Sequence, residues 1–318
     1  MKSKSSMLFA AAAFALGVAS ASAQERLTSR HGADDQAGAS NLITPEKAKQ
    51  AAGLIKQGKT YPLARTYEAK MPLFGARVFA LRATGGLAGG PAGDNKVIWN
   101  DDFLATEIGQ VGTQFDGLGH IGIRTAEGDR YYNGVKGEEL HGPAGLEKLG
   151  IGNVKPFFTR GILVNLEAYK GKMLELGYEV TVDDIKGALQ KQGFDAETIS
   201  SGDVVLLHTG WGSSWGKENA KFNSGEPGIG LEAARWLVGK GVAVVGADTW
   251  AVEVVPNPDS RLAFVVHQEL IARNGIFLHE NVATERLAAD GVTEFAYSFA
   301  PMPLKGATGA PGNALAIR

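Results

Sequence analysis

The chain contains no cysteine, which excludes disulfides, thiolate metal sites and cysteine nucleophiles. Neither sign of charge dominates, because 32 Lys and Arg residues oppose 34 Asp and Glu residues. The sequence has no basic stripe, so its charge pattern does not indicate binding to nucleic acid. Beyond the N-terminus there is no apolar run of the roughly 20 residues that cross a bilayer. What remains is a globular composition, with 44% hydrophobic residues in 318 positions and 43 glycines that predict many loops.

The first 23 residues have the pattern of a secretory signal peptide. Lys2 and Lys4 precede the apolar run 7–19, and residues 21–23 read Ala-Ser-Ala, a small-x-small cleavage site. The apolar run is too short for a comfortable membrane anchor, which is the alternative interpretation. We expect cleavage after Ala23 and a periplasmic or secreted protein with no membrane attachment. The absence of cysteine is compatible with the bacterial periplasm.

The mature chain, residues 24–318, is predicted to be one α/β domain. Apolar segments that predict strands alternate with segments that predict helices, a pattern typical of a sheet covered on both faces. The predicted strands are 61–68, 76–83, 159–166, 203–208, 242–246, 276–278 and 293–300. The predicted helices are 45–56, 183–192, 231–238 and 262–273. Residues 85–95 include five glycines and predict a mobile loop that could act as a lid.

One candidate site lies in residues 110–120, which read Gln-Val-Gly-Thr-Gln-Phe-Asp-Gly-Leu-Gly-His. Alternation places Gln114 and Asp116 on the same side of an extended segment. Four glycines, at 109, 112, 117 and 119, would let the backbone approach a ligand. Without cysteine, a metal site must use His, Asp and Glu side chains of this kind. A glycine-rich loop with solvated polar residues explains the same segment equally well.

A second candidate site combines His267 with the segment His279-Glu280-Asn281. His267 shares its predicted helix face with apolar residues at 264, 270 and 271, so we expect its ring to point inward. A core histidine satisfied by a backbone carbonyl is the alternative. Glu280 ends an apolar strand, a position from which a side chain can reach a site.

Taken in order, these motifs resemble the cyclase family of metal-dependent hydrolases, which includes bacterial kynurenine formamidase and isatin hydrolase. The family hallmark H-x-G-T-H-x-D-x-P-x-H corresponds to residues 110–120, with Gln110 and Gln114 in place of its first two histidines and Leu118 in place of its proline. Further matching segments are 34–45, 159–163, 202–211, 245–249, His267 and 280–281. The resemblance implies a layered, barrel-like α/β core with a mixed sheet and flanking helices, assembled as a homodimer or homotetramer.

The resemblance also implies a set of metal ligands. In two-metal members, the first two motif histidines and the aspartate hold one ion. The aspartate, the last motif histidine, a helix histidine and a later glutamate hold the other. Only the second set is complete here, as Asp116, His120, His267 and Glu280. We therefore predict one divalent ion, Zn²⁺ favoured and Mn²⁺ compatible, with Gln114 as an extra ligand or a substrate contact.

The chemistry implied is attack by metal-activated water, with His120 or Glu280 as proton carrier. The candidate substrate contacts are Gln110, Trp99, His208, Trp211 and Trp250. Core packing is the alternative for the tryptophans, and a buried structural role is the alternative for His208.

The predicted function is hydrolysis of an amide, lactam, lactone or N-formyl bond in a small carbonyl compound. No G-x-G-x-x-G segment follows a predicted strand, which disfavours a dinucleotide-binding enzyme. The alternative is a periplasmic small-molecule binding protein of the same fold, which the two glutamines in place of histidine would explain.

Overall fold

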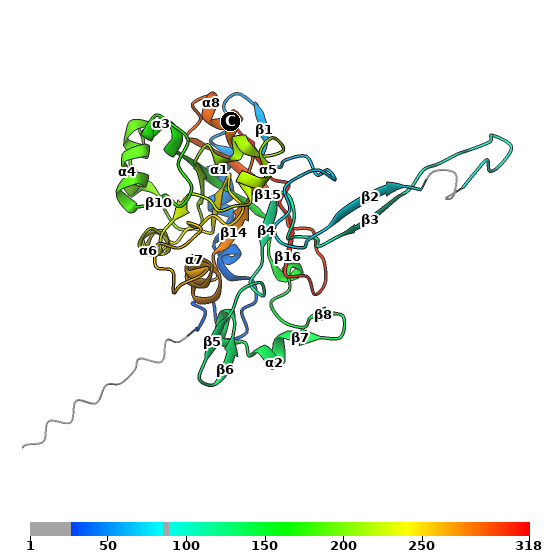
Figure 1. Cartoon of the computed structure of the whole chain (residues 1–318), viewed down its shortest axis with the longest axis horizontal. Helices are drawn as coiled ribbons and strands as arrows, with labels where there is room; N and C mark the ends of the chain where they lie inside the picture. The colour runs from blue at the N-terminus through cyan, green and yellow to red at the C-terminus, as the bar shows by residue number, and fades with distance from the viewer. Residues whose placement is uncertain (1–26, 85–88) are drawn as a thin grey trace, which may run out of the picture.

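One mixed sheet of nine strands forms the centre of the molecule (Figure 1). This computed structural model describes residues 27–84 and 89–318, so the predicted signal peptide lies outside the described residues. The strands follow the order β1-β17-β15-β9-β11-β13-β14-β4-β16. Their bounds are β1 Thr60–Pro62, β4 Gln114–Asp116, β9 Phe157–Asn165, β11 Val204–His208, β13 Val244–Ala247, β14 Phe277–Glu280, β15 Glu294–Phe299, β16 Gly309–Pro311 and β17 Leu315–Ile317.

The middle of this sheet is parallel and its two sides are antiparallel. Strands β9, β11, β13 and β14 run parallel to one another. On one side β15, β17 and β1 follow, and on the other side β4 and β16 follow, each antiparallel to its neighbour. The parallel strands are buried almost throughout, as expected for a sheet covered on both faces. This curled mixed sheet confirms the predicted α/β fold class.

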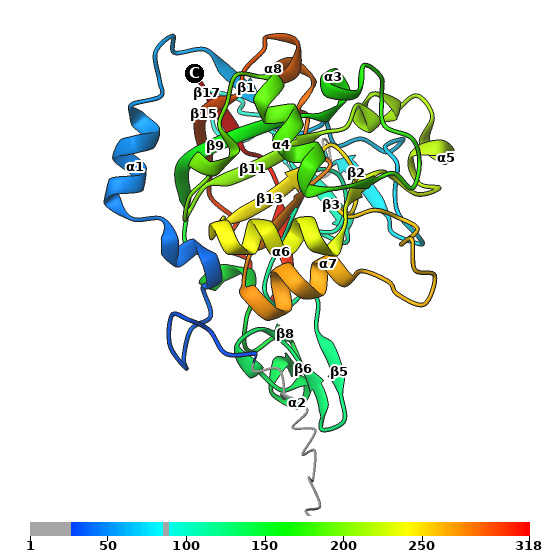
Figure 2. The same ribbon diagram turned by 90° about the vertical axis from the view of Figure 1, so that its left-hand side faces the viewer.

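Helices cover the parallel strands, as Figure 2 shows for α4, α6 and α7 in front of β9, β11 and β13. The helices are α1 Pro45–Ala52, α2 Gly137–Leu140, α3 Leu166–Lys170, α4 Val182–Lys191, α5 Asn219–Phe222, α6 Leu231–Lys240, α7 Val265–His267 and α8 Glu285–Ala289. The two longest have clear end signals. Thr181 and Asp184 form a capping box at the start of α4, and Gly241 ends α6 in the left-handed conformation. No helix in the described part of the chain is long and apolar enough to cross a bilayer.

Two sequence predictions for elements differ from the structure. The helix predicted over 262–273 begins only at Val265, because Phe264 has a φ of 51°. It continues after His267 as a π-helix, η6 Gln268–Arg273, the widened form that is common at functional sites. The strand predicted over 61–68 ends at Pro62, and one further backbone hydrogen bond joins Leu63 N–H to the Ala314 carbonyl.

A long arm projects from the body (Figure 1). It is built by β2 Phe79–Ala83 and β3 Asp102–Thr106, which pair antiparallel with Leu81 opposite Leu104. Of the predicted lid, residues 85–95, residues 85–88 lie outside the described ranges. Its described part continues the arm and lines no part of the cavity described below, which does not support a lid at that cavity.

Four shorter strands and α2 form a second projection below the sheet in Figure 1. They pair as two small hairpins, β5 Ile123–Thr125 with β6 Gly128–Arg130 and β7 His141–Gly142 with β8 Gly145–Leu146. A further short pair, β10 Glu179–Val180 with β12 Gly228–Ile229, is parallel.

Two glycines of the motif around β4 are needed for packing against the C-terminal segment. A Cβ atom at Gly109 would lie 2.4 Å from the carbonyl carbon of Gly309, and one at Gly117 would lie 2.6 Å from the carbonyl oxygen of Thr308. Backbone cannot move aside as a flexible side chain can. These glycines therefore serve the close approach of β16 to β4, and not the approach of a ligand that the sequence suggested.

Candidate metal centre

The candidate site is assembled where β4 lies between β14 and β16. The antiparallel register places Gln114 opposite Glu280 and Asp116 opposite Leu278. Gln114 and Asp116 share one face of β4, as the alternation predicted, while Phe115 points to the other face. The two segments that the sequence singled out separately are therefore neighbours across one strand pair.

Three of the predicted ligands come together. One ligand atom from each of Asp116, His267 and Glu280 can be chosen so that all three lie within 4.8 Å of one another. His267 Nε2 lies 3.2 Å from Glu280 Oε1 and 3.8 Å from Asp116 Oδ2. All three residues are buried. Two carboxylates and an imidazole at this spacing form a donor set suited to a divalent cation.

His267 is held in position by a carboxylate that the sequence analysis missed. Glu253 Oε1 accepts a hydrogen bond from His267 Nδ1 at 2.5 Å and another from the His267 backbone N–H at 3.0 Å. This contact keeps the proton on Nδ1 and turns Nε2 toward Asp116 and Glu280. Histidines that bind metals are commonly oriented by such a carboxylate.

The centre contains more buried acidic groups than basic groups, so a bound cation would stabilise it. Three buried carboxyl groups lie beside His267, and they belong to Asp116, Glu253 and Glu280. Asp116 Oδ2 is buried and has no hydrogen-bond partner among the described residues. An unpaired buried charge is costly, and a divalent ion between these groups would remove that cost. The residues present therefore fit a metal ion.

The pKa values express the same charge imbalance. Burial raises the pKa of Glu280 to about 8, and the nearby Asp116 carboxylate adds to this effect. Burial alone would lower the pKa of His267, but its hydrogen bonds to Glu253 and Glu280 raise that pKa to about 10. Both raised pKa values mean that Glu280 and His267 hold their protons more tightly. In the metal-free protein these protons supply the positive charge between the carboxylates.

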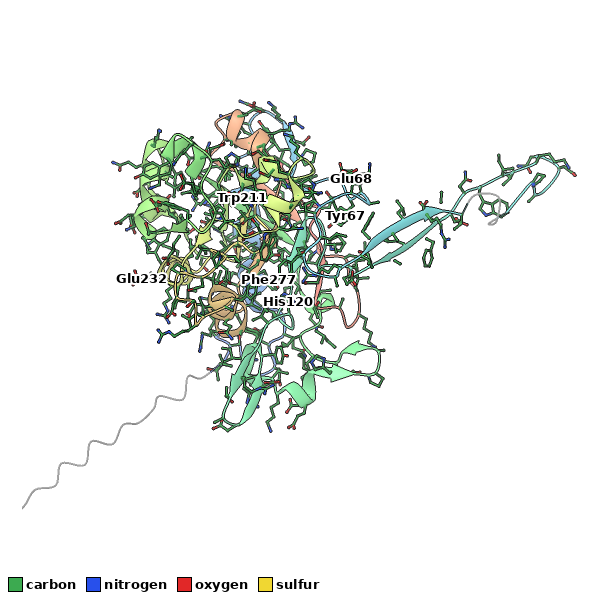
Figure 3. All side chains as sticks on the ribbon, in the orientation of Figure 1. Tyr67, Glu68, His120, Trp211, Glu232 and Phe277 are labelled. Atoms are coloured by element: carbon green, nitrogen blue, oxygen red, sulfur yellow. The ribbon has the colours of Figure 1, made fainter. Side chains whose placement is uncertain are left out.

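His120, the fourth predicted ligand, lies at the edge of this cluster. Its Nε2 is 3.7 Å from Asp116 Oδ2, and its side chain is 21% exposed, whereas the other three are buried. Burial lowers the pKa of His120, so its ring is neutral near pH 7. His120 is thus the histidine of the centre that a ligand can reach, and Figure 3 shows it within the central body.

The two glutamines bind the carboxylates of the centre through their amide nitrogens. Gln114 Nε2 donates to Glu280 Oε2 at 2.5 Å, and Gln110 Nε2 donates to Asp116 Oδ1 at 3.1 Å. Each carboxylate thereby keeps its other oxygen for the cluster. In this arrangement Gln114 supports the Glu280 carboxylate through its amide nitrogen, and its amide oxygen remains an acceptor.

A cavity of about 190 Å³ opens beside the centre. Its polar wall includes His120, His267 and Glu280, and its apolar wall is largely aromatic. The lining residues are Phe74, Arg77, Gln110, Gln114, His120, Ile121, Trp250, Ala251, Phe264, His267 and Glu280. Gln110 and Trp250 thus lie where the sequence analysis placed substrate contacts.

Three other predicted substrate contacts do not lie at this cavity. Trp211 is buried in a small cluster and donates to the Phe222 carbonyl, and Figure 3 shows it in another part of the body from His120. Trp99 belongs to the exposed arm, where its side chain lies beside Gly89. His208 binds Thr284 and Glu167 and lines a separate cavity of about 440 Å³ at the carboxyl end of β11. The structure therefore does not bring Trp211, Trp99 or His208 of this chain to the cavity, and their roles as substrate contacts stay predictions.

His279, in the segment His279-Glu280-Asn281, is a core histidine. It contacts the Gly312 carbonyl through Nε2 at 2.9 Å and the Tyr297 hydroxyl through Nδ1 at 3.0 Å. Burial lowers its pKa to about 4, so it stays neutral. It points away from the centre because neighbouring residues of a strand face opposite sides.

The residues that the sequence analysis missed are Glu253, Arg77, Phe74 and Phe264. Of these, only Glu253 could have been noticed in the sequence, because it is a single acidic residue inside the apolar run 251–255. Arg77 and Phe74 precede the arm, and Phe264 precedes α7, in segments with no motif of their own.

Comparison with known proteins places this site in a family. The profile described as "Putative cyclase" matches residues 61–254, more than half of the chain. The chain belongs to the cyclase family. A crystal structure described as a novel cyclase is 33% identical to this cyclase-family protein, with 90% of this chain and 95% of that chain covered and a TM-score of 0.80. No curated protein matches the chain.

More distant structures share the fold of this cyclase-family protein. Isatin hydrolase A from Ralstonia solanacearum is 20% identical, with 85% of this chain and 95% of that chain covered and a TM-score of 0.61. Isatin hydrolase A from Labrenzia aggregata, bound to benzyl benzoate, is 19% identical, with 84% and 94% covered and a TM-score of 0.60. The family and the donor set together support metal binding and a hydrolase fold.

Proposed function

We propose that this protein is a metal-dependent hydrolase that cleaves a C–N or C–O bond of a small carbonyl compound. Amides, lactams, lactones and N-formyl compounds are the substrate types that this chemistry covers. The observation that carries the proposal is the buried oxygen of Asp116 without a hydrogen-bond partner. It lies beside His267 and Glu280, and these two residues line a cavity. Such a site concentrates charge where a carbonyl compound can enter.

Asp116, His267 and Glu280 would hold one divalent ion, with His120 beside them. Zn²⁺ is favoured because carboxylate and imidazole ligands suit it, and Mn²⁺ is compatible with the same set. A divalent ion at this position acidifies water and polarises a carbonyl group. Glu253 fixes the orientation of His267, and the two glutamine amides fix the carboxylates, so the centre is preorganised.

The chain's own part in the reaction is to exclude bulk water and to move a proton. Attack of water forms a C–O bond at the carbonyl carbon and breaks the bond to the leaving nitrogen or oxygen. The proton lost by water has to reach that leaving atom. His120 Nε2 is suited to carry it, because the ring is neutral and accessible from the cavity.

The test is metal analysis combined with a hydrolysis screen of the purified protein. We expect one bound ion per chain and turnover of at least one compound among N-formyl amides, isatin-like lactams and lactones. Turnover should stop with a chelator and return with Zn²⁺ or Mn²⁺. Ligand-dependent thermal stabilisation without turnover at saturating metal would instead indicate a binding protein of the same fold.

We also propose that the chain assembles as a homodimer or homotetramer through its arm. Leu81 and Leu104 are 57% and 46% exposed on one face of the arm, and Phe103 is 51% exposed on the other. An isolated two-stranded hairpin is at best marginally stable in water, and exposed apolar patches of this kind mark interaction surfaces. A second copy of the chain would cover both faces of the arm.

The arm gives a prediction about assembly. The double variant Leu81→Asp/Leu104→Asp should be monomeric in light scattering at concentrations where the wild-type chain is dimeric or tetrameric. Leu262→Asp is the matched control, because Leu262 is 45% exposed but lies outside the arm. A wild-type chain that is monomeric at micromolar concentration would refute this proposal.

A further inference from the structure

Arg77 is an unpaired cation at the wall of the cavity. Among the described residues that line the cavity it is the only Lys or Arg. It also lines a smaller neighbouring cavity that it shares with Gln110 and Gln114. In residues 27–84 and 89–318 no carboxylate lies within ion-pair distance of its guanidinium, whereas six of the eleven other arginines described there have such a partner.

Few of the hydrogen-bonding groups of Arg77 are used within the described part of the chain. Its guanidinium donates to Gln110 Oε1 at 3.3 Å. Gln110 in turn donates to Asp116, so an arginine, an amide and a carboxylate follow one another from the cavity to the metal centre. A guanidinium has five N–H donors in a planar arrangement that matches a carboxylate. The remaining donors are available to a ligand in the cavity.

The apolar part of the cavity wall is largely aromatic. Phe74 stacks on Trp250 with ring centroids 4.4 Å apart and an interplanar angle of 21°. Phe264 packs edge-on against both Trp250 and His267. The aromatic wall therefore directly contacts a residue of the metal centre. Arg77 itself lies over the Phe74 ring, 5.4 Å from its centroid. Flat apolar walls accept a planar group, and a volume of about 190 Å³ limits the ligand to a small one.

We propose that Arg77 binds a carboxylate of the substrate. The substrate class is then a small planar carbonyl compound that carries a carboxylate in addition to the bond that is cleaved. The aromatic wall holds the planar group, Arg77 holds the carboxylate, and the scissile carbonyl lies toward Asp116, His267 and Glu280. This assignment rests on the proposed hydrolase function of the same site.

The experiment compares two compounds that differ only by a carboxylate, N-formylanthranilate and formanilide. Hydrolysis and equilibrium binding of both are measured with the metal-loaded wild type, Arg77→Met and Arg77→Lys. The wild type should prefer N-formylanthranilate in kcat/KM, and Arg77→Met should lower that preference about 10- to 100-fold, as expected for loss of charge-assisted hydrogen bonds. The loss should appear mainly in KM, and Arg77→Lys should restore part of it.

Arg82→Met is the matched control. Arg82 is an arginine of the arm that lies over the Phe103 ring and lines no part of the cavity, so its replacement should leave the preference as in the wild type. An equal preference in the wild type and Arg77→Met overturns the assignment of Arg77, even if hydrolysis proceeds. Tight binding of N-formylanthranilate that depends on Arg77 supports the ligand class even without turnover, and such a result would contradict only the hydrolase function.

Discussion

Replacing Asp116 with asparagine is expected to remove the bound metal ion and the hydrolytic activity together. Asp116 contributes the one buried oxygen of the centre without a partner, and asparagine keeps its shape while removing its charge. Loss of a residue that only supports a metal ligand costs about 10- to 100-fold in metal affinity. Loss of the ligand itself should cost more than about 100-fold. Metal content of the purified variant and calorimetric titration with Zn²⁺ and Mn²⁺ measure this loss.

The stability of metal-free Asp116→Asn separates a functional role from a structural one. In the metal-free protein Asp116 lies beside Glu280, whose pKa is raised partly by the Asp116 carboxylate. Above pH 8, where Glu280 is ionised, removing one of two repelling carboxylates should leave the metal-free melting temperature unchanged or raise it. A residue required for folding would lower it. Functional sites often carry such a stability cost.

Glu167→Gln provides the control for the metal measurement. Glu167 is also a carboxylate next to a histidine, with Oε2 at 3.1 Å from His208 Nε2, but it lines the separate cavity of about 440 Å³. Its variant should still bind one ion per chain. If Asp116→Asn retains the ion, or if Glu167→Gln loses it, the centre is not where we place it.

Replacing Phe115 with alanine is expected to lower the free energy of unfolding by about 3–5 kcal/mol, the usual cost of truncating a buried aromatic ring. Phe115 is fully buried between Gln114 and Asp116, on the face of β4 opposite the metal centre. Its ring lies 4.7 Å from that of Phe299, 5.2 Å from that of Phe277 and 5.5 Å from that of Phe157. Chemical unfolding of the metal-free protein measures the loss.

Phe103→Ala is the matched control for this prediction. Phe103 is also a strand phenylalanine, but it lies exposed on the arm. In the Leu81→Asp/Leu104→Asp background, where no partner is expected to cover the arm, its loss should change the free energy of unfolding by no more than about 0.5 kcal/mol. Phe115→Leu should cost less than Phe115→Ala, because leucine refills part of the space. A Phe115→Ala change as small as that of Phe103→Ala would show that β4 is not anchored by its apolar face.

The sequence predicted the parts of the site that depend on local pattern. Alternation correctly placed Gln114 and Asp116 on one side of a strand, and helical spacing correctly turned His267 inward. The strands of the parallel core were predicted because they are continuous apolar runs. Each of these conclusions needs only a few neighbouring residues.

The parts that were missed depend on pairing between distant segments. The register that sets Gln114 against Glu280 joins residues 166 positions apart, and no local pattern encodes it. Glu253 reaches His267 because a loop folds back onto α7. His208 ends a strand as Glu280 does, but β11 lies two strands away from β14, and its end opens into another cavity.

The position of β4 between β14 and β16 has a consequence for how the protein acquires its metal. β4 has only three residues, and both of its neighbours come from the last part of the chain to be synthesised. A partial chain that ends before residue 277 has Asp116 and His267 but lacks Glu280 and both strands that hold β4. The centre therefore forms only once synthesis is nearly complete. Because affinity alone discriminates poorly among divalent ions, the metal available where folding finishes would contribute to which ion occupies the proposed centre.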